Sequence, residues 1–368
     1  MSYGQVNADV IGTSVANSSL GAGNATLMKN KIINGACVID QRNAGASVTP
    51  TVNATYTLDR WMAELSQASK FSVQQNAGSV TPPAGFTNYL GVTSLSAYSV
   101  NAGDYFTIEN RIEGFNTADL GWGTSNAKTV TLSFWVRSSL TGTFGGALQN
   151  NSFNRSYPFS YTISSANTWT NISITVAGDT TGTWNTTNGI GIDVVFGLGI
   201  GSTYGSGTAG VWASSLIFAP SGSVSVVGTN GATWYITGVQ LEVGSSATGF
   251  EYENYTSLLQ KCQRYYAKET SSTGYVGFGS GYLGGSNVAN IYTKYPVTMR
   301  TAPTIAFSNL ILIGGGTSGT VSTLGVYAGS DSALLSPNTS TSPFTAYQGC
   351  ALTGDSSGTG FLTLSAEL

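Results

Sequence analysis

The sequence predicts an all-β protein: a β-sandwich, then a short helical connector, then a smaller C-terminal β domain. Charged residues make up only 8% of the 368 residues, whereas a typical soluble domain carries about 25%, and Lys, Glu and Arg normally cover helix surfaces. Glycine supplies 48 residues, and 19 Tyr and 7 Trp accompany many Ser, Thr and Asn. This composition is typical of extended strands joined by polar turns. Most of the apolar segments are short, and only one has a helical period.

The composition also excludes several classes of function. The chain has no histidine, so neither a Ser-His-Asp triad nor a histidine-ligated metal site can form within it. Its 14 basic and 17 acidic residues give a net charge of −3, which leaves no basic face for nucleic acid. Cys37, Cys262 and Cys350 have no paired spacing, and we interpret them as inert thiols. The N-terminus lacks the pattern of a secretory signal and no stretch reaches the ~18 apolar residues of a membrane span, so we expect no membrane insertion.

Residues 1–27 form the first segment, which is small and polar and has little apolar periodicity. Such a segment cannot bury a core by itself. It is therefore either a flexible tail or an anchor peptide that a partner orders, and we favour the anchor.

Residues 28–253 contain the predicted sandwich. Asn34-Gly35 divides 31–40 into a candidate pair of strands. Residues 129–137 alternate, with Val130, Leu132, Phe134 and Val136 on one face, as in a strand with one buried face. Further strands are predicted at 56–62, 97–100, 105–112, 157–163, 169–176, 192–198, 211–218, 224–227 and 234–243. Many short strands at this spacing favour a β-sandwich.

Residues 254–270 interrupt the β pattern. Leu258, Cys262 and Tyr265 fall at helical spacing, and Asn254 is a candidate N-cap. This helix either packs on its own domain or packs against symmetry mates in a trimer. Strands at 288–292, 304–307 and 361–364 then predict a second, smaller β domain over residues 271–368.

Several motifs occur in the order found in one group of proteins. They are 30–36 with Gln41-Arg42, 56–61, 111–114, 131–139, 236–244 with 247–251, 262–266 and 299–304. Together they resemble a jelly-roll module of bacteriophage tail-fibre and virion-surface proteins, which is similar to carbohydrate-binding modules. The resemblance implies a virion protein, commonly a homotrimer, at or near the host-contacting tip. We expect it to join other virion proteins through residues 1–27 and to adsorb to a bacterial surface glycan.

Aromatic residues in polar loops are the candidate glycan contacts. Trp122, Trp184 and Tyr204 lie among Gly, Asn, Ser and Thr, and a sugar ring offers an apolar CH face to an aromatic ring and hydroxyls to its polar neighbours. Each could instead fold back onto the core. Trp61, Trp135 and Trp234 lie in alternating strands, which favours core packing for them.

No catalytic residues are expected. Glu109 and Glu113 share a face of one predicted strand, but their spacing of ~13 Å exceeds the ~6.5–9.5 Å of inverting glycosidases. A glycan-degrading tailspike is therefore the weakest alternative. A purely structural capsid decoration or fibre protein without a receptor is the stronger one.

Carbohydrate-binding jelly rolls often hold a structural Ca²⁺, so the resemblance implies that this chain could have a Ca²⁺ site. Asp40 and Glu242 are the acidic residues nearest the opening and closing strands. The closing strand has Thr237-Gly238 where an acidic pair is common. About six oxygen ligands would be needed.

Overall fold

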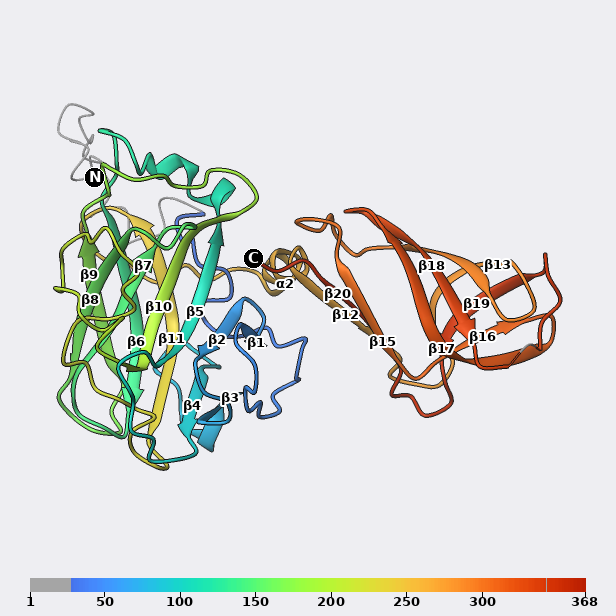
Figure 1. Cartoon of the computed structure of the whole chain (residues 1–368), viewed down its shortest axis with the longest axis horizontal. Coiled ribbons are helices and arrows are strands. Elements are labelled where there is room, and N and C mark those ends of the chain that lie inside the picture. The colour runs from blue at the N-terminus through green and yellow to red at the C-terminus, as the bar shows by residue number, and fades with distance from the viewer. Residues whose placement is uncertain (1–27, 342) are drawn as a thin grey trace, which may run out of the picture. The chain divides into compact units, whose positions relative to one another are not determined.

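The computed structural model describes residues 28–341 and 343–368, and the chain divides after Asn254 into two compact units (Figure 1). The predicted anchor, residues 1–27, lies outside the described residues. In the part of the chain that is described, no helix has both the length and the apolar character needed to cross a membrane.

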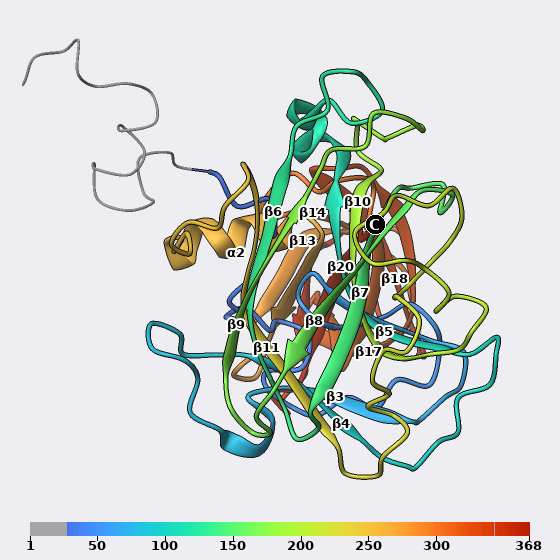
Figure 2. The same ribbon diagram turned by 90° about the vertical axis from the view of Figure 1, so that its left-hand side faces the viewer.

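The first unit is a jelly-roll β-sandwich of two antiparallel sheets, whose strands are seen in Figures 1 and 2. The six-stranded sheet has the order β1 (Thr55–Leu58), β2 (Trp61–Leu65), β5 (Tyr105–Glu113), β10 (Ile190–Ile200), β7 (Gly142–Gln149), β8 (Ser156–Ile163). The five-stranded sheet has the order β3 (Phe71–Gln75), β4 (Leu90–Ser94), β11 (Thr233–Val243), β6 (Val130–Ser138), β9 (Thr170–Val176). Short 3-10 helices are η2 (Ala77–Ser79), η3 (Gly114–Asn116) and η4 (Ala118–Leu120). The predicted all-β class is thus confirmed.

The core of this unit lies between the two sheets. Val130, Leu132, Phe134 and Val136 are fully buried in it, as the alternation in β6 predicts. Trp61 and Trp234 are also buried, and the Trp234 indole N–H donates to the Tyr161 hydroxyl at 2.9 Å.

Trp135 is not a core residue, contrary to the prediction. It is only half-buried, because the period of two places it on the face of β6 opposite to Phe134 and Val136. Its cross-strand partners are Asn171 and Thr237.

The segment 31–40 forms turns rather than the predicted pair of strands. The Asn34 side chain donates to the carbonyls of Ile39 and Asp59, at 2.8 Å each, and accepts from the Ile39 N–H at 3.0 Å. Gly35 is tied to β11, since the Val239 N–H donates to its carbonyl at 3.0 Å. Side-chain hydrogen bonds therefore replace a strand ladder here.

Four other strand predictions also need correction. The segment 56–62 is divided into β1 and β2 by a turn at Asp59-Arg60, where Arg60 has φ 68°. Residues 97–100, 211–218 and 224–227 form no strand. Val226 and Val227 are nevertheless fully buried. Ala213 forms only an isolated β-bridge, with Ser156, so 211–218 does not become a continuous strand.

The second unit contains α2 (Tyr255–Gln263), a three-stranded sheet and a closed barrel. The sheet has the order β12 (Tyr266–Thr270), β20 (Phe361–Ser365), β15 (Thr304–Ser308). The barrel has the order β13 (Gly277–Leu283), β14 (Ala289–Lys294), β18 (Ser332–Thr339), β17 (Thr317–Ala328), β16 (Leu310–Gly314), β19 (Gly349–Gly354). Its buried side chains include Leu283, Ile291, Leu312, Leu335 and Leu352.

The apolar stripe of the connector is buried within a single chain. Leu258, Cys262 and Tyr265 are 8%, 0% and 0% exposed. The Tyr265 carbonyl, just after α2, accepts from the Ala366 N–H at 2.8 Å. The stripe is therefore covered by the chain's own residues, and a homotrimer, which stays a prediction, would have to use other surfaces.

We predict that Gly35→Ala destabilises the sandwich unit by about 1–3 kcal/mol or more, because an added Cβ would lie 2.0 Å from the Val239 carbonyl oxygen. Gly103→Ala is the matched control, since no atom lies within 4 Å of a Cβ there. Urea denaturation of both variants measures the effect. If the two variants have the same free energy of unfolding, the close contact between Gly35 and the Val239 carbonyl does not exclude a side chain at position 35.

Candidate functional site

Three tryptophans from different loops meet at one end of the sandwich. Trp122 follows η4, Trp184 precedes β10, and Trp212 lies in the long segment after β10. Their ring centroids are 4.7 Å (Trp122–Trp184), 5.4 Å (Trp122–Trp212) and 5.6 Å (Trp184–Trp212) apart, and all three pairs are edge-to-face. Aromatic quadrupoles favour this edge-to-face arrangement. We call these three residues the tryptophan cluster.

Each indole N–H of the cluster is held by a hydrogen bond. Trp122 donates to the Lys128 carbonyl at 2.8 Å, and Trp212 donates to the Ala177 carbonyl at 2.9 Å. Trp184 donates to Asp179 Oδ2 at 3.3 Å. The rings are therefore fixed in orientation, which lowers the entropy that a ligand would have to remove on binding.

Within the cluster, Trp122 is a core residue. It is 7% exposed and belongs to the same packed cluster as Leu120 and Ile192. Trp184 and Trp212 are half-buried and pack against it. Of the two interpretations left open by the sequence, folding back onto the core therefore holds for Trp122, whereas Trp184 keeps an accessible part.

An ion pair borders the cluster. The Arg155 guanidinium donates from Nε and Nη2 to the two oxygens of Asp179, at 2.7 Å each, and lies 5.7 Å from the centre of the Trp212 ring. Burial raises the Asp179 pKa, but hydrogen bonds from Arg155 and Thr181 outweigh it and hold that pKa below its usual value. Arg155 also donates to the Ser214 hydroxyl at 2.8 Å. The cluster thus has a polar rim with a fixed charge pair.

The recess between Trp122 and Trp184 is small. It has a volume of about 10 Å³ and is also lined by Asn185 and Thr186. Such a space holds at most one water molecule. A sugar ring could therefore contact the outer surface of Trp184 and Trp212 but could not enter between the rings.

Tyr204 belongs to a different aromatic group. Its ring lies 5.7 Å from Tyr105 and 5.4 Å from Phe218. Trp184 precedes the first residue of β10 and packs against Trp122 and Trp212, whereas Tyr204 follows the last residue of β10. The structure therefore does not bring Tyr204 together with Trp122 and Trp184. Trp212, which does join them, was missed because it lies in a segment predicted to be a strand.

A row of charged residues lies on the face of the six-stranded sheet that points away from the core. Arg111 contacts Glu64 at 2.6 Å, Asp193 at 2.9 Å and Glu109 at 3.6 Å. Burial raises the Glu109 pKa well above its usual value, and the charges of Asp193 and Glu64 raise it further, against the opposing effect of Arg111. Polar residues at every second position of β5 are the sequence signal that indicates this row.

The charged row is closed to a large substrate. Glu109 is 1% exposed and Asp193 is fully buried, and both lie beside the Arg111 guanidinium. A glycosidase needs its two carboxyl groups on either side of an accessible sugar bond. The geometry therefore gives this row a structural role.

The carboxylates of Asp40 and Glu242 accept hydrogen bonds from the protein. Asp40 accepts from the N–H groups of Asn43 and Gly45 at 3.0 and 2.7 Å. Glu242 accepts from Gln240 and from the Thr248 N–H and hydroxyl, at 2.6–2.9 Å. Among residues 28–341 and 343–368, no group of three or more Cys, Asp or Glu is placed to hold a metal ion. Within those described residues, no further carboxylate joins Asp40 or Glu242 to complete the Ca²⁺ site considered from the sequence.

Comparison with known proteins gives distant structural likenesses only. No family model matches the chain, and no curated protein matches it by sequence. A putative sugar binding protein from Bacteroides thetaiotaomicron is 12% identical, with 59% of this chain and 100% of that chain covered and a TM-score of 0.35. The family 11 carbohydrate-binding module from Clostridium thermocellum is 11% identical, with 54% and 95% covered and a TM-score of 0.28.

The enzymatically active domain of bacteriophage CBA120 tailspike protein 4 also matches in part. It is 11% identical over 52% of this chain, with a TM-score of 0.29, and the match spans only 22% of the tailspike chain. All three TM-scores are low, so the function of this chain has to be inferred from its own residues.

We predict that Trp122→Ala lowers the free energy of unfolding by about 3–5 kcal/mol, because it removes a buried ring beneath two others. Trp184→Ala, at a half-buried position, should cost clearly less. Urea denaturation followed by circular dichroism compares the two. A smaller loss for Trp122→Ala than for Trp184→Ala would contradict the assignment of Trp122 to the core.

We predict that Glu109→Gln becomes more stabilising, relative to the unchanged protein, as pH rises. The folded-state pKa of Glu109 lies above its unfolded value of ~4.3. The favourable contribution of protonated Glu109 to the free energy of unfolding is therefore complete below about pH 4.3. The contribution is lost as pH rises through the folded pKa, whereas Gln has no proton to lose. Urea denaturation at several pH values from 4 to 9 measures the difference, and a pH-independent difference would contradict it.

Proposed function

We propose that this chain is a surface protein of a phage virion, a tail fibre or related appendage, that adsorbs to a bacterial host by binding glycan. The observation that carries the proposal is the tryptophan cluster. Trp184 and Trp212 are half-buried, lie at a loop end of the sandwich and are held rigid above Trp122. Rigid aromatic rings with a polar rim suit a ligand that has an apolar face and a hydroxylated edge.

The chemistry of the rim fits this ligand. Arg155, Ser214 and Asn185 supply polar groups around the rings. The CH face of a pyranose would lie against the Trp184 indole, and its hydroxyls would exchange hydrogen bonds with the rim. Stacking and neutral hydrogen bonds depend little on salt, which agrees with a chain in which only 8% of residues are charged.

The virion assignment is supported by the motif resemblance between residues 30 and 304. On this proposal the protein acts outside the cell as part of the particle, as a homotrimer, and residues 1–27 join it to other virion proteins. The proposed action is binding rather than catalysis, and the burial of Glu109 and Asp193 supports this part of the proposal.

A second candidate function is a structural appendage that binds no receptor. The small volume of the recess between Trp122 and Trp184, about 10 Å³, favours it, because closed clusters of this kind also occur simply as packing. The two candidates differ in one measurable property, which is adsorption of the purified protein to host cells.

We predict that Trp184→Ala weakens adsorption to host cells about five- to thirty-fold per site, because it removes ring stacking worth about 1–2 kcal/mol. The melting temperature should fall by only a few degrees. Trp135→Ala is the matched control: Trp135 is also a half-buried tryptophan, but it lies on β6 outside the cluster.

Binding of fluorescently labelled protein to cells measures both variants. If Trp184→Ala and Trp135→Ala adsorb equally while both remain folded, the tryptophan cluster is not the binding site. If the unchanged protein does not adsorb at all, the structural alternative replaces the proposal.

A further inference from the structure

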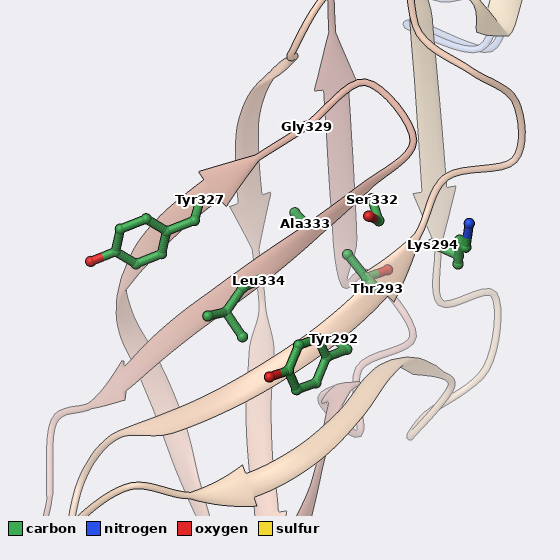
Figure 3. Close-up of a pocket in the computed structure, with 8 residues that line it drawn as sticks. All are labelled: Tyr292, Thr293, Lys294, Tyr327, Gly329, Ser332, Ala333 and Leu334. Atoms are coloured by element: carbon green, nitrogen blue, oxygen red, sulfur yellow. The ribbon is translucent and has the colours of Figure 1, made fainter.

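An aromatic row crosses the outer face of the barrel in the second unit. Tyr292 on β14 pairs with Leu334 on β18, and Leu334 pairs with Tyr327 on β17. Tyr292 is 63% exposed and Tyr327 is 73% exposed. Figure 3 shows Leu334 lying between the two rings. Since neighbouring strands are ~4.8 Å apart, the tyrosines are separated by about 10 Å across β18 and do not stack on each other.

Polar residues form the next row on the same face. Lys294 pairs with Ser332, two residues along from the tyrosine row, so the period of two places all of these side chains outward. Both Lys294 and Ser332 are exposed. The Lys294 side chain forms no ion pair or hydrogen bond with any residue that the structure describes.

The two rows enclose a groove of about 440 Å³, which also reaches Gly329 in the turn between β17 and β18. Small-molecule sites usually have volumes of ~300–1,000 Å³, and the recess in the tryptophan cluster has only about 10 Å³. The groove therefore has room for a sugar unit, whereas that recess does not.

We propose that this groove is a second saccharide-binding site and that its ligand is a sugar unit bearing a carboxylate. The exposed tyrosine rings supply the apolar contact for the CH face of a pyranose. Lys294 supplies the only positive charge among the residues that line the groove, and it pairs with the sugar carboxylate. The Ser332 hydroxyl lies beside Lys294 in the same row and exchanges hydrogen bonds with the sugar hydroxyls.

The size of the groove argues against a second copy of the chain as its occupant. Eight residues line it, whereas a stable protein–protein interface involves about 20–30 residues on each side. The aliphatic content is also low: Leu334 and Ala333 are the only aliphatic side chains of the lining, and Ala333 is buried.

This proposal takes the class of ligand, a saccharide, from the proposed function. The groove and the tryptophan cluster share no residues, so either site can fail its test while the other stands. The test is affinity electrophoresis of the full chain in gels that contain polygalacturonate, hyaluronate or polysialic acid, with neutral dextran as the reference. The variants are Tyr292→Ala, Tyr327→Ala and Lys294→Gln. Tyr347→Ala is the matched control, because Tyr347 is 87% exposed and lies outside the groove.

We expect the unchanged protein to be retarded by at least one acidic polysaccharide and not by dextran. Each tyrosine variant should weaken this binding about tenfold, and Lys294→Gln should weaken it and reduce its salt dependence. Tyr347→Ala and Trp184→Ala should bind normally. Absence of retardation in all three acidic gels, or equal retardation of groove variants and control, would overturn the proposal. If the groove proposal fails in this way but Trp184→Ala still loses adsorption to host cells, the proposed function stands without a second site.

Discussion

Strands β5 and β10 are buried on both of their faces, and this constraint shapes the rest of the sandwich unit. Along β5, Phe106 and Ile108 point into the core, so the period of two places Glu109 and Arg111 on the opposite face. That face is buried too, and a charge removed from water must be paired. Three carboxylates therefore gather around one guanidinium. Burial raises the Glu109 pKa, and because the carboxylates outnumber the positive charge beside them, the charges of Asp193 and Glu64 raise it further.

The cover over this face also explains the main failure of strand prediction. Part of the segment 201–223 lies on the face: the Gln149 amide donates to the Ile217 carbonyl at 2.8 Å, and Phe218 packs 5.2 Å from Tyr105. A Cβ at Gly145 would lie 2.7 Å from Pro220 Cδ, so glycine in β7 allows this close approach. The segment 211–218 is apolar because it covers a sheet. Periodicity cannot distinguish that role from strand pairing.

Other elements could be predicted because their signal is local. The alternation in β6 identifies its buried face, and the helical spacing of Leu258 and Cys262 identifies α2. The candidate site could be predicted only in part, because its residues come from three loops that the fold brings together. Trp122 and Trp184 meet, but Tyr204 lies at the far end of β10. The local sequence around each residue does not show which of these rings the fold brings together.

The two aromatic surfaces differ in a way that follows from the elements that carry them. Loops can bend, so the three tryptophans turn their edges onto one another and leave little open space. Barrel strands hold their side chains at a fixed spacing, so Tyr292 and Tyr327 cannot close onto each other across β18. Their rings keep most of their surface exposed. At the saccharide site proposed on the barrel, rigid strands display these rings without the ordering cost that mobile loops would add on binding.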